Sequence, residues 1–128
     1  LVGKVIAANS GRDVAIVKID GSLPKFFKIG KDIPPVGAEV FAVGTPRAEK
    51  FQSTLSRGIV SSVREEQNKI LIQSDVNVLP GNSGGPLVDK NGAAVGITVS
   101  GLMINNAPQG INFFIPIGDA LKSMGVVM

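Results

Sequence analysis

Apolar and polar residues alternate along most of this chain with a period of two, which is the period of a β-strand. Short strands are predicted over residues 2–8 and 14–19, and the Asn-Ser-Gly-Arg stretch between them favours a turn. Six more strands are predicted, over residues 39–44, 54–64, 69–74, 86–89, 93–101 and 110–116. Six strands suffice to close a small antiparallel barrel, so the pattern predicts an all-β protein.

Two other segments depart from the strand period. Residues 21–35 contain three prolines, and proline supplies no amide hydrogen to a strand ladder or a helix. We expect this segment to be a crossover between two lobes and not a central strand. Residues 117–124 have the spacing of a short amphipathic helix, with their apolar residues on one side.

Composition agrees with a β-rich globular fold. At 128 residues the chain has the size of one domain, which buries roughly two-thirds of the surface of the unfolded chain. Hydrophobic residues make up 44%, charged residues 18%, and 16 residues are glycine, which argues against disorder. The net charge of +3 is scattered, and Trp and Tyr are absent, so nucleic acid is a poor candidate partner.

The chain contains neither cysteine nor histidine. Disulfides and metal sites made of thiolate or imidazole ligands are therefore excluded, and we predict no cofactor and no metal ion. No apolar run approaches the length that spans a bilayer, and no signal peptide opens the chain. We predict no membrane segment in this chain, while a signal or anchor upstream of Leu1 stays open.

Residues 81–87, Gly-Asn-Ser-Gly-Gly-Pro-Leu, place a serine on a glycine-rich turn before an apolar strand. Such a turn can carry a nucleophile together with its oxyanion hole. The backbone N–H groups of Gly81 and Ser83 would stabilise the negative oxygen that forms when Ser83 attacks a carbonyl. Glycine at positions 81 and 84 permits backbone angles that are closed to other residues. The alternative interpretation is a plain surface turn between two strands.

Five stretches together resemble one known family. Residues 81–87 resemble the serine motif of trypsin-like peptidases, and Gln-Ser-Asp-Val-Asn at residues 73–77 resembles its HtrA/Deg branch. Residues 95–101 are similar to the family strand that pairs with substrate, and residues 110–116 to the strand behind the specificity pocket. Residues 12–19 are similar to the segment whose aspartate orients the catalytic histidine. The resemblance extends from about residue 2 to about residue 121.

The resemblance implies a trypsin-like double β-barrel. We expect three parts along the chain. Residues 1–35 would hold the last strands of the first barrel and the crossover, and residues 36–117 the second barrel with the serine motif. Residues 118–128 would form a C-terminal helix and tail. The second, six-stranded antiparallel barrel would be complete and the first one only partial.

The resemblance further implies a serine endopeptidase that acts through an acyl-enzyme at Ser83. Asp13 would orient a histidine, which in this family precedes the aspartate and the serine in the chain. Since the sequence has no histidine, we expect the catalytic histidine to lie upstream of Leu1. The chain would then be a fragment of a longer peptidase, and we expect the fragment alone to be inactive. The alternative is a catalytically dead pseudo-protease that keeps a peptide groove as a binding or interaction module.

The aspartates differ in their settings. Asp13 follows a Gly-Arg pair, where an aspartate is often a turn-capping residue, but it also opens an apolar strand, where a carboxylate needs a partner. The imidazole of the missing histidine would be that partner. Asp75 matches an acidic position of the HtrA-like pattern, and we predict a structural role for it.

The resemblance also places the substrate. Alignment with the family assigns one pocket wall to Asn77, Val78, Leu79 and Pro80, the opposite wall to Gly110, Ile111 and Asn112, and the backbone that pairs with an extended peptide to Val99, Ser100 and Gly101. None of these residues is acidic, so a small or medium apolar side chain is the expected preference rather than Lys or Arg.

Asn82 replaces the aspartate that precedes the nucleophile in digestive trypsin-like enzymes. An amide cannot form their ion pair with a new N-terminal amine, so the resemblance implies activation by loop ordering instead. The expected partner is a peptide or an unfolded protein, and a homo-oligomer is left open. A periplasmic, secreted or membrane-anchored location is expected from the resemblance alone.

Overall fold

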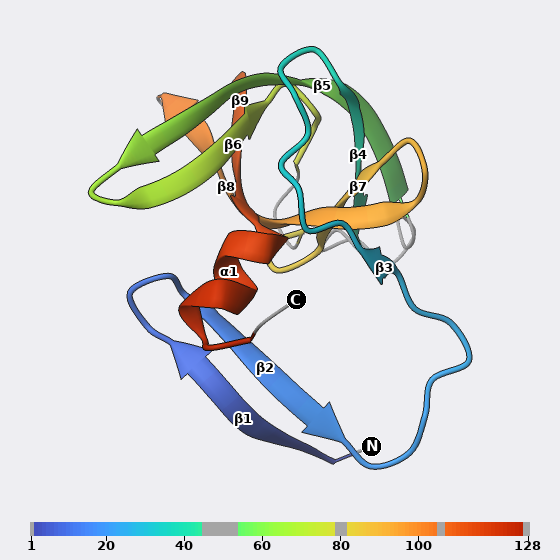
Figure 1. Ribbon diagram of the computed structural model, residues 1–128. Helices are drawn as coiled ribbons and strands as arrows, with labels where there is room; N and C mark the ends of the chain where they lie inside the picture. The colour runs from blue at the N-terminus through green and yellow to red at the C-terminus, as the bar shows by residue number, and fades with distance from the viewer. Residues whose placement is uncertain (1, 45–53, 79–81, 105–106, 127–128) are drawn as a thin grey trace.

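The computed structural model of the protein describes residues 2–44, 54–78, 82–104 and 107–126 (Figure 1). These residues form nine strands and one helix: β1 (Gly3–Asn9), β2 (Val14–Ile19), β3 (Lys28–Ile29), β4 (Glu39–Gly44), β5 (Thr54–Glu66), β6 (Lys69–Ser74), β7 (Pro86–Asp89), β8 (Ala93–Ile104), β9 (Ala107–Pro116) and α1 (Ile117–Ser123). The predicted all-β class, with one short C-terminal helix, is confirmed.

Six strands close into an antiparallel barrel. Their order is β8-β7-β4-β5-β6-β9, and β9 pairs with β8 to complete the circle. The six barrel strands predicted from the alternation are therefore confirmed. Three of them extend beyond the predicted bounds, since β5 reaches Glu66, β8 reaches Ile104 and β9 begins at Ala107.

The barrel core is formed by the inward residues of successive strands. Phe114, Ile72, Leu87, Val40 and Val60 are all fully buried, and each comes from a different strand. Burying a side chain of this size stabilises a fold by about 1.5–3 kcal/mol. Alternation along the strands thus produces one shared core.

The crossover contains a short strand that the sequence did not predict. β3 pairs in parallel with β8 at Ala93 and Ala94, and the N–H of Gly30 continues the ladder to the Ala94 oxygen at 2.9 Å. Both residues of β3 are exposed, so they carry no alternation that a pattern could detect. β3 lies at the edge of the sheet, which agrees with the expectation that the segment holds no central strand.

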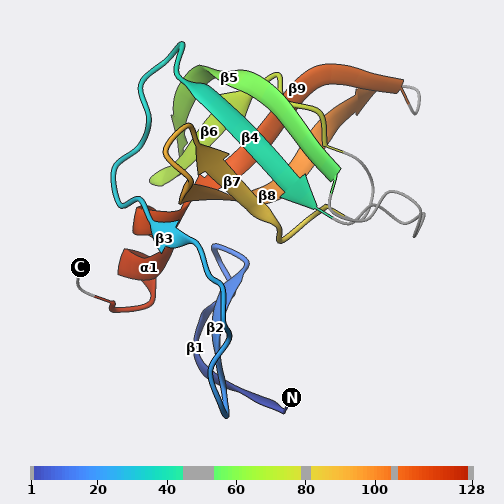
Figure 2. The same cartoon turned by 90° about the vertical axis from the view of Figure 1, so that its right-hand side faces the viewer.

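β1 and β2 form a separate two-stranded sheet. The views in Figures 1 and 2 show this hairpin projecting from one side of the barrel, with α1 on that same side. Several apolar side chains of the hairpin and the crossover are solvent-exposed, including Val2 at 83%, Val17 at 55% and Phe26 at 82%. The predicted strands over residues 2–8 and 14–19 are confirmed.

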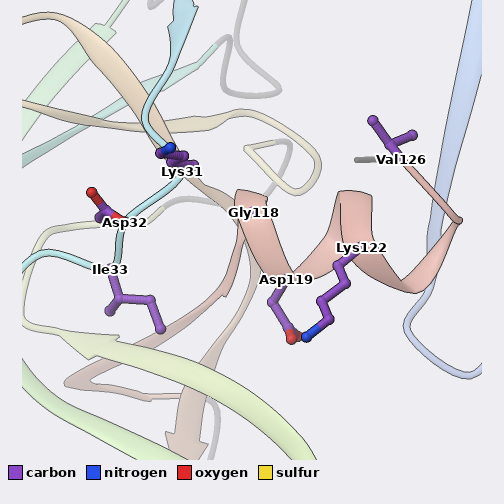
Figure 3. A pocket seen from close by; sticks show the side chains of 7 residues that line it. All are labelled: Lys31, Asp32, Ile33, Gly118, Asp119, Lys122 and Val126. Carbon is purple, nitrogen blue, oxygen red and sulfur yellow. The ribbon is translucent and has the colours of Figure 1, made fainter. Parts of the chain in front are cut away.

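α1 follows β9 directly and packs on the crossover. A Cβ on Gly118 would collide with the carbonyl oxygen of Lys31, so the backbones of α1 and the crossover approach closely here. Beside this contact lies a cavity of about 460 Å³, whose lining residues include Lys31, Asp119 and Lys122 (Figure 3). The helix therefore touches the crossover.

Candidate active site

The serine lies on a turn that is hydrogen-bonded to β8. Gly84 has a φ of 87°, in the left-handed region that favours glycine. Its N–H donates to the Thr98 oxygen at 2.8 Å, and the Thr98 N–H donates to the Gly85 oxygen at 2.9 Å. A third bond, from the Gly85 N–H to the Asn82 oxygen at 2.9 Å, closes the turn. Ser83 is thereby fixed at the entrance of β7.

The hydroxyl of Ser83 is accessible. The residue is exposed, and Ser83 Oγ donates a hydrogen bond to the Val99 carbonyl oxygen at 3.1 Å. A serine hydroxyl becomes a strong nucleophile only when a base accepts its proton. A backbone carbonyl holds the hydroxyl in place without providing this activation.

Asn82 is buried beneath the turn, at 4% exposure. A Cβ on Gly44 would collide with the Asn82 side-chain oxygen, so a larger residue at this end of β4 would displace the Asn82 side chain. Within the described ranges, neither Asn82 Oδ1 nor the hydroxyl of buried Thr98 has a hydrogen-bond partner. Sequence reasoning did not identify Gly44 or Thr98, because their role depends on contacts between distant segments.

Asp13 is a turn residue that also opens β2. The turn over residues 10–13 is closed by hydrogen bonds from the Arg12 N–H to the Asn9 oxygen at 3.2 Å and from the Asp13 N–H to the Ser10 oxygen at 3.3 Å. Asp13 has a φ of 58°, a left-handed conformation that aspartate tolerates better than most residues. Its side chain is exposed.

Asp13 and Val99 of β8 border a common cavity. Asp13 and Val99 both line a cavity of about 260 Å³, together with Arg12 and Lys69. Val99 also accepts the hydrogen bond of Ser83, so one residue of β8 contacts Ser83 and lines the cavity of Asp13.

The segment over residues 74–78 is fixed by buried hydrogen bonds. The Asn112 side-chain nitrogen donates to the Val76 oxygen at 2.5 Å, and the Val76 N–H donates to Ser74 Oγ at 3.1 Å. Ser74 Oγ in turn donates to the Ile59 oxygen at 2.6 Å. Asn112, from one predicted pocket wall, thus binds the residue that precedes the other wall.

The other predicted wall residues have varied surroundings. Asn77 is exposed, and Val78 packs against the barrel core. Gly110 has a φ of 71°, and Ile111 is half-buried. Leu79, Pro80 and Gly81 lie outside the described residues, so the Gly81 half of the predicted oxyanion hole stays a prediction.

Asp75 has a structural contact. Its Oδ1 accepts a hydrogen bond from the Ile59 N–H at 2.9 Å. This bond joins the segment over residues 74–78 to β5. The contact agrees with the structural role predicted for Asp75.

The β7 side of β8 has a free stretch beside Ser83. β7 pairs with β8 only from Pro86 opposite Ile97 to Val88 opposite Ala94. At the next residue, the backbone N–H and C=O of Thr98 are hydrogen-bonded to the serine turn. Across the ranges that the structure describes, no strand pairs with residues 99–101 on this side, while β9 pairs on the other.

Arg12 is a further residue that the sequence interpretation gave no role. Its side chain is only 9% exposed although the residue is charged, and it forms an ion pair with Asp119 of α1. No local pattern signals this pair, because 107 residues separate its members.

In the part of the chain that the structure describes, no group of three or more acidic, histidine or cysteine side chains could hold a metal ion. No helix among the same residues has the length and hydropathy to cross a bilayer.

Comparisons with known proteins agree on one family. The trypsin-like peptidase domain family matches residues 1–97. The chain is 38% identical over 126 residues to a probable periplasmic serine endoprotease DegP-like of Pseudomonas fluorescens, covering 94% of this chain and 26% of the relative. It is 34% identical over 125 residues to Protease Do-like 1, chloroplastic, of Arabidopsis thaliana, covering 89% of this chain and 28% of the relative.

A solved structure shows the same arrangement. The HtrA-type protease AlgW with decapeptide superimposes with a TM-score of 0.83 at 31% identity, covering 96% of this chain and 39% of that one. The chain therefore spans about a quarter to two-fifths of the length of these proteins. With its closed barrel and its serine turn on β8, the chain belongs to the trypsin-like serine peptidases, in their HtrA/Deg branch.

Proposed function

We propose that this chain carries the nucleophile and the orienting acid of a serine endopeptidase. The observation that supports this most strongly is the exposed Ser83 on a glycine turn, fixed to β8 beside a stretch of free strand edge. Such an edge can accept an extended peptide as an added strand and bring its carbonyl to the serine.

The reaction has two steps. Ser83 Oγ forms a bond to the peptide carbonyl carbon while a histidine outside these 128 residues accepts its proton. The C–N bond then breaks, and the amine leaves with that proton. Water then attacks the acyl carbon while the histidine accepts its proton; the bond to Ser83 Oγ breaks, the acid product leaves, and the proton returns to Ser83 Oγ. Asp13 holds the histidine in the tautomer that accepts the serine proton.

The oxyanion is stabilised by the amides of Gly81 and Ser83. The fixed turn that follows, with Gly84 in the left-handed region, supports a preorganised Ser83 amide. One such donor contributes roughly a hundredfold to a thousandfold in rate. Since Asn82 is an amide, ordering of this loop by other contacts is the proposed route of activation.

The specificity pocket lies between the segment over residues 77–80 and the strand residues 110–112. The hydrogen bond between Asn112 and Val76 supports this placement, because it joins one wall to the residue directly before the other. No acidic residue occurs in these two stretches. The preferred residue before the cleaved bond is therefore small or medium-sized and apolar.

The 128-residue chain alone is proposed to be nearly inactive. It has no histidine, and the Ser83 proton is directed at the Val99 oxygen. Loss of the histidine from such an enzyme lowers the rate by about a millionfold. Efficient peptide cleavage by the purified chain would contradict this.

The decisive experiment is labelling of the full-length gene product with a fluorophosphonate, read by intact mass, with Ser83→Ala as control. Labelling that is lost in the variant supports an activated Ser83. Absence of labelling, together with binding of an extended peptide, supports the second candidate, a pseudo-protease that acts as a peptide-binding module. The missing histidine and the free edge at residues 99–101 favour that candidate if labelling fails.

The partner is proposed to be a peptide or an unfolded protein, since AlgW is solved with peptides. A periplasmic, secreted or membrane-anchored location is proposed, and the name of the periplasmic DegP-like relative supports it. Self-association is proposed because Val2 and Phe26 are more than four-fifths exposed. A clean monomer of the 128-residue chain by light scattering would overturn the proposal of self-association.

A further inference from the structure

We propose that Arg12 is a positioning residue for Asp13, and that it acts by tying the turn before β2 to α1 and β6. This inference rests on the proposed function, because it concerns the geometry of the same reaction. It assigns a role in catalysis to an ion pair between two distant parts of the chain.

The Arg12 side chain reaches two elements of the barrel lobe. Its Nη2 atom donates to the Ile70 oxygen of β6 at 3.2 Å and forms the ion pair with Asp119 of α1. The guanidinium suits this task because it offers several donors in a fixed fork. Only 9% of the Arg12 side chain and 31% of the Asp119 side chain are exposed, so solvent screens the pair less than an exposed one.

Two further contacts fix the same turn. Lys69 Nζ donates to the Gly11 oxygen at 2.6 Å. Asn9 Nδ2 donates to the Ser123 oxygen at 3.2 Å, and Asn9 Oδ1 accepts from the Arg12 N–H at 3.1 Å. The turn is therefore held on one side by the first residues of β6 and on the other by α1.

Asp13 depends on this turn for its position. No hydrogen bond of its carboxylate occurs among the described residues, and its side chain is exposed. The backbone of the turn, with Asp13 at a φ of 58°, therefore determines where the carboxylate points. Arg12 is the adjacent residue and anchors that backbone through its own side chain.

Charge neutralisation alone does not explain the pair. Figure 3 shows Asp119 and Lys122 on the same side of α1, yet the ion pair of Asp119 is with Arg12 of the distant turn and not with Lys122 of its own helix. What Arg12 adds is a link between the helix and the turn.

The test uses the full-length peptidase and two variants, Arg12→Ala and Asp119→Asn. We expect kcat to fall about tenfold to a hundredfold in both, because small misplacements of catalytic groups have effects of this size. KM should stay within about twofold, since neither residue lies in the proposed peptide groove. Arg12→Lys should retain more activity than Arg12→Ala.

The pH dependence separates positioning from a loss of folded protein. A displaced Asp13 stabilises the imidazolium of the histidine less, so the acid limb of kcat/KM should shift to lower pH. Lys69 also lines the cavity of Asp13 and is unchanged in both variants. Arg12→Ala and Asp119→Asn alter the local charge in opposite directions, so a shift to lower pH in both reports the position of Asp13.

Arg57→Ala is the matched control, since it removes an arginine from an exposed pair with Glu39 and should change neither kcat nor the pH profile. Unchanged kcat and pH profiles in folded Arg12→Ala and Asp119→Asn would overturn the inference. Should Arg12→Ala fail to fold, Asp119→Asn alone decides. If the fluorophosphonate does not label the wild type at Ser83, the proposed function fails and this inference fails with it. If the fluorophosphonate labels the wild type and both variants at the same rate, only the inference fails.

Discussion

The six-stranded barrel and the β1–β2 hairpin differ in how they are stabilised. In the barrel every strand has two neighbours, and the inward side chains are fully buried. The hairpin is a sheet of two strands, with exposed apolar residues such as Val5 and Val17. It is attached to the rest of the chain mainly through polar contacts at its turn.

This difference separates the two proposed catalytic residues. Ser83 lies on a turn of the closed barrel, where backbone hydrogen bonds between the turn and β8 determine its place. Asp13 lies on a hairpin, and an isolated two-stranded hairpin is at best marginally stable in water. The nucleophile should therefore be robust to perturbation, and the position of the acid should be sensitive to it.

The largest effect is expected in the barrel core. Phe114→Ala should lower the free energy of unfolding by about 3–5 kcal/mol, because Phe114 is fully buried and its removal leaves a cavity. Urea denaturation followed by circular dichroism measures this. Phe26→Ala, at an exposed site of the crossover, should cost less than about 0.5 kcal/mol. Equal losses in the two variants would refute the contrast between barrel and periphery.

Glycine positions give a second, smaller contrast. A Cβ at Gly58 of β5 would lie 2.6 Å from the Val76 nitrogen and 2.7 Å from its Cα, so backbone would have to move. Gly58→Ala should destabilise the chain by about 1–3 kcal/mol, the usual range for overpacking. At Gly11 of the hairpin turn, the same change meets only Asn9 Oδ1 at 3.4 Å. Thermal unfolding of both variants should show a clear loss for Gly58→Ala alone, and a loss at Gly11 of the same size would contradict this.

A third effect should be confined to the hairpin. Asn9→Ala removes one hydrogen bond to α1 and one to the Arg12 N–H. The local opening free energy should fall by about 1 kcal/mol, which speeds hydrogen exchange of β2 amides about fivefold. Exchange in β4 and β7 serves as the internal control and should not change. Faster exchange throughout the chain would mean that the hairpin and the barrel unfold as one unit.

The smallest effect is expected at the exposed ion pair of the barrel. The Arg57 and Glu39 side chains are 72% and 44% exposed, and their closest charged atoms lie 3.8 Å apart. Glu39→Ala should change stability by less than about 0.5 kcal/mol, as is common for exposed pairs. A loss in urea denaturation close to that of a buried pair would contradict the view that burial distinguishes Arg12 from Arg57.

The barrel was predictable because its signal is local. Alternation in β4 and β6 predicted their bounds, since buried residues recur at every second position there; β7 was predicted as a short apolar run, and its adjacent Leu87 and Val88 are both buried. The Asn-Gly pair at residues 91–92 is typical of a two-residue hairpin loop, but β7 ends at Asp89 and β8 begins at Ala93. Gly92 has a positive φ and Asn91 does not, and Asp89 Oδ1 accepts from the Asn91 N–H at 2.9 Å. That carboxylate stabilises a three-residue loop, which the sequence pattern did not predict.

The candidate site was predictable only in part. The serine turn and the aspartate before β2 were identified from their neighbours in the sequence, and both remain predictions as catalytic residues. The burial of Asn82 against Gly44 and the pairing of Arg12 with Asp119 were not predicted. Such contacts join segments that only the closed fold brings together, so no pattern along the chain reveals them.

The contact between Arg12 and Asp119 also limits when the turn of Asp13 can be anchored to α1 during protein synthesis. Its members are 107 residues apart, so a ribosome that adds about 5–20 residues per second needs roughly 5–20 s to make the second after the first. Until α1 leaves the ribosome, the turn that carries Asp13 lacks its anchor on the helix. The anchor on α1 is therefore among the last contacts that synthesis makes possible, while the contacts of the same turn with Ile70 and Lys69 of β6 are possible earlier.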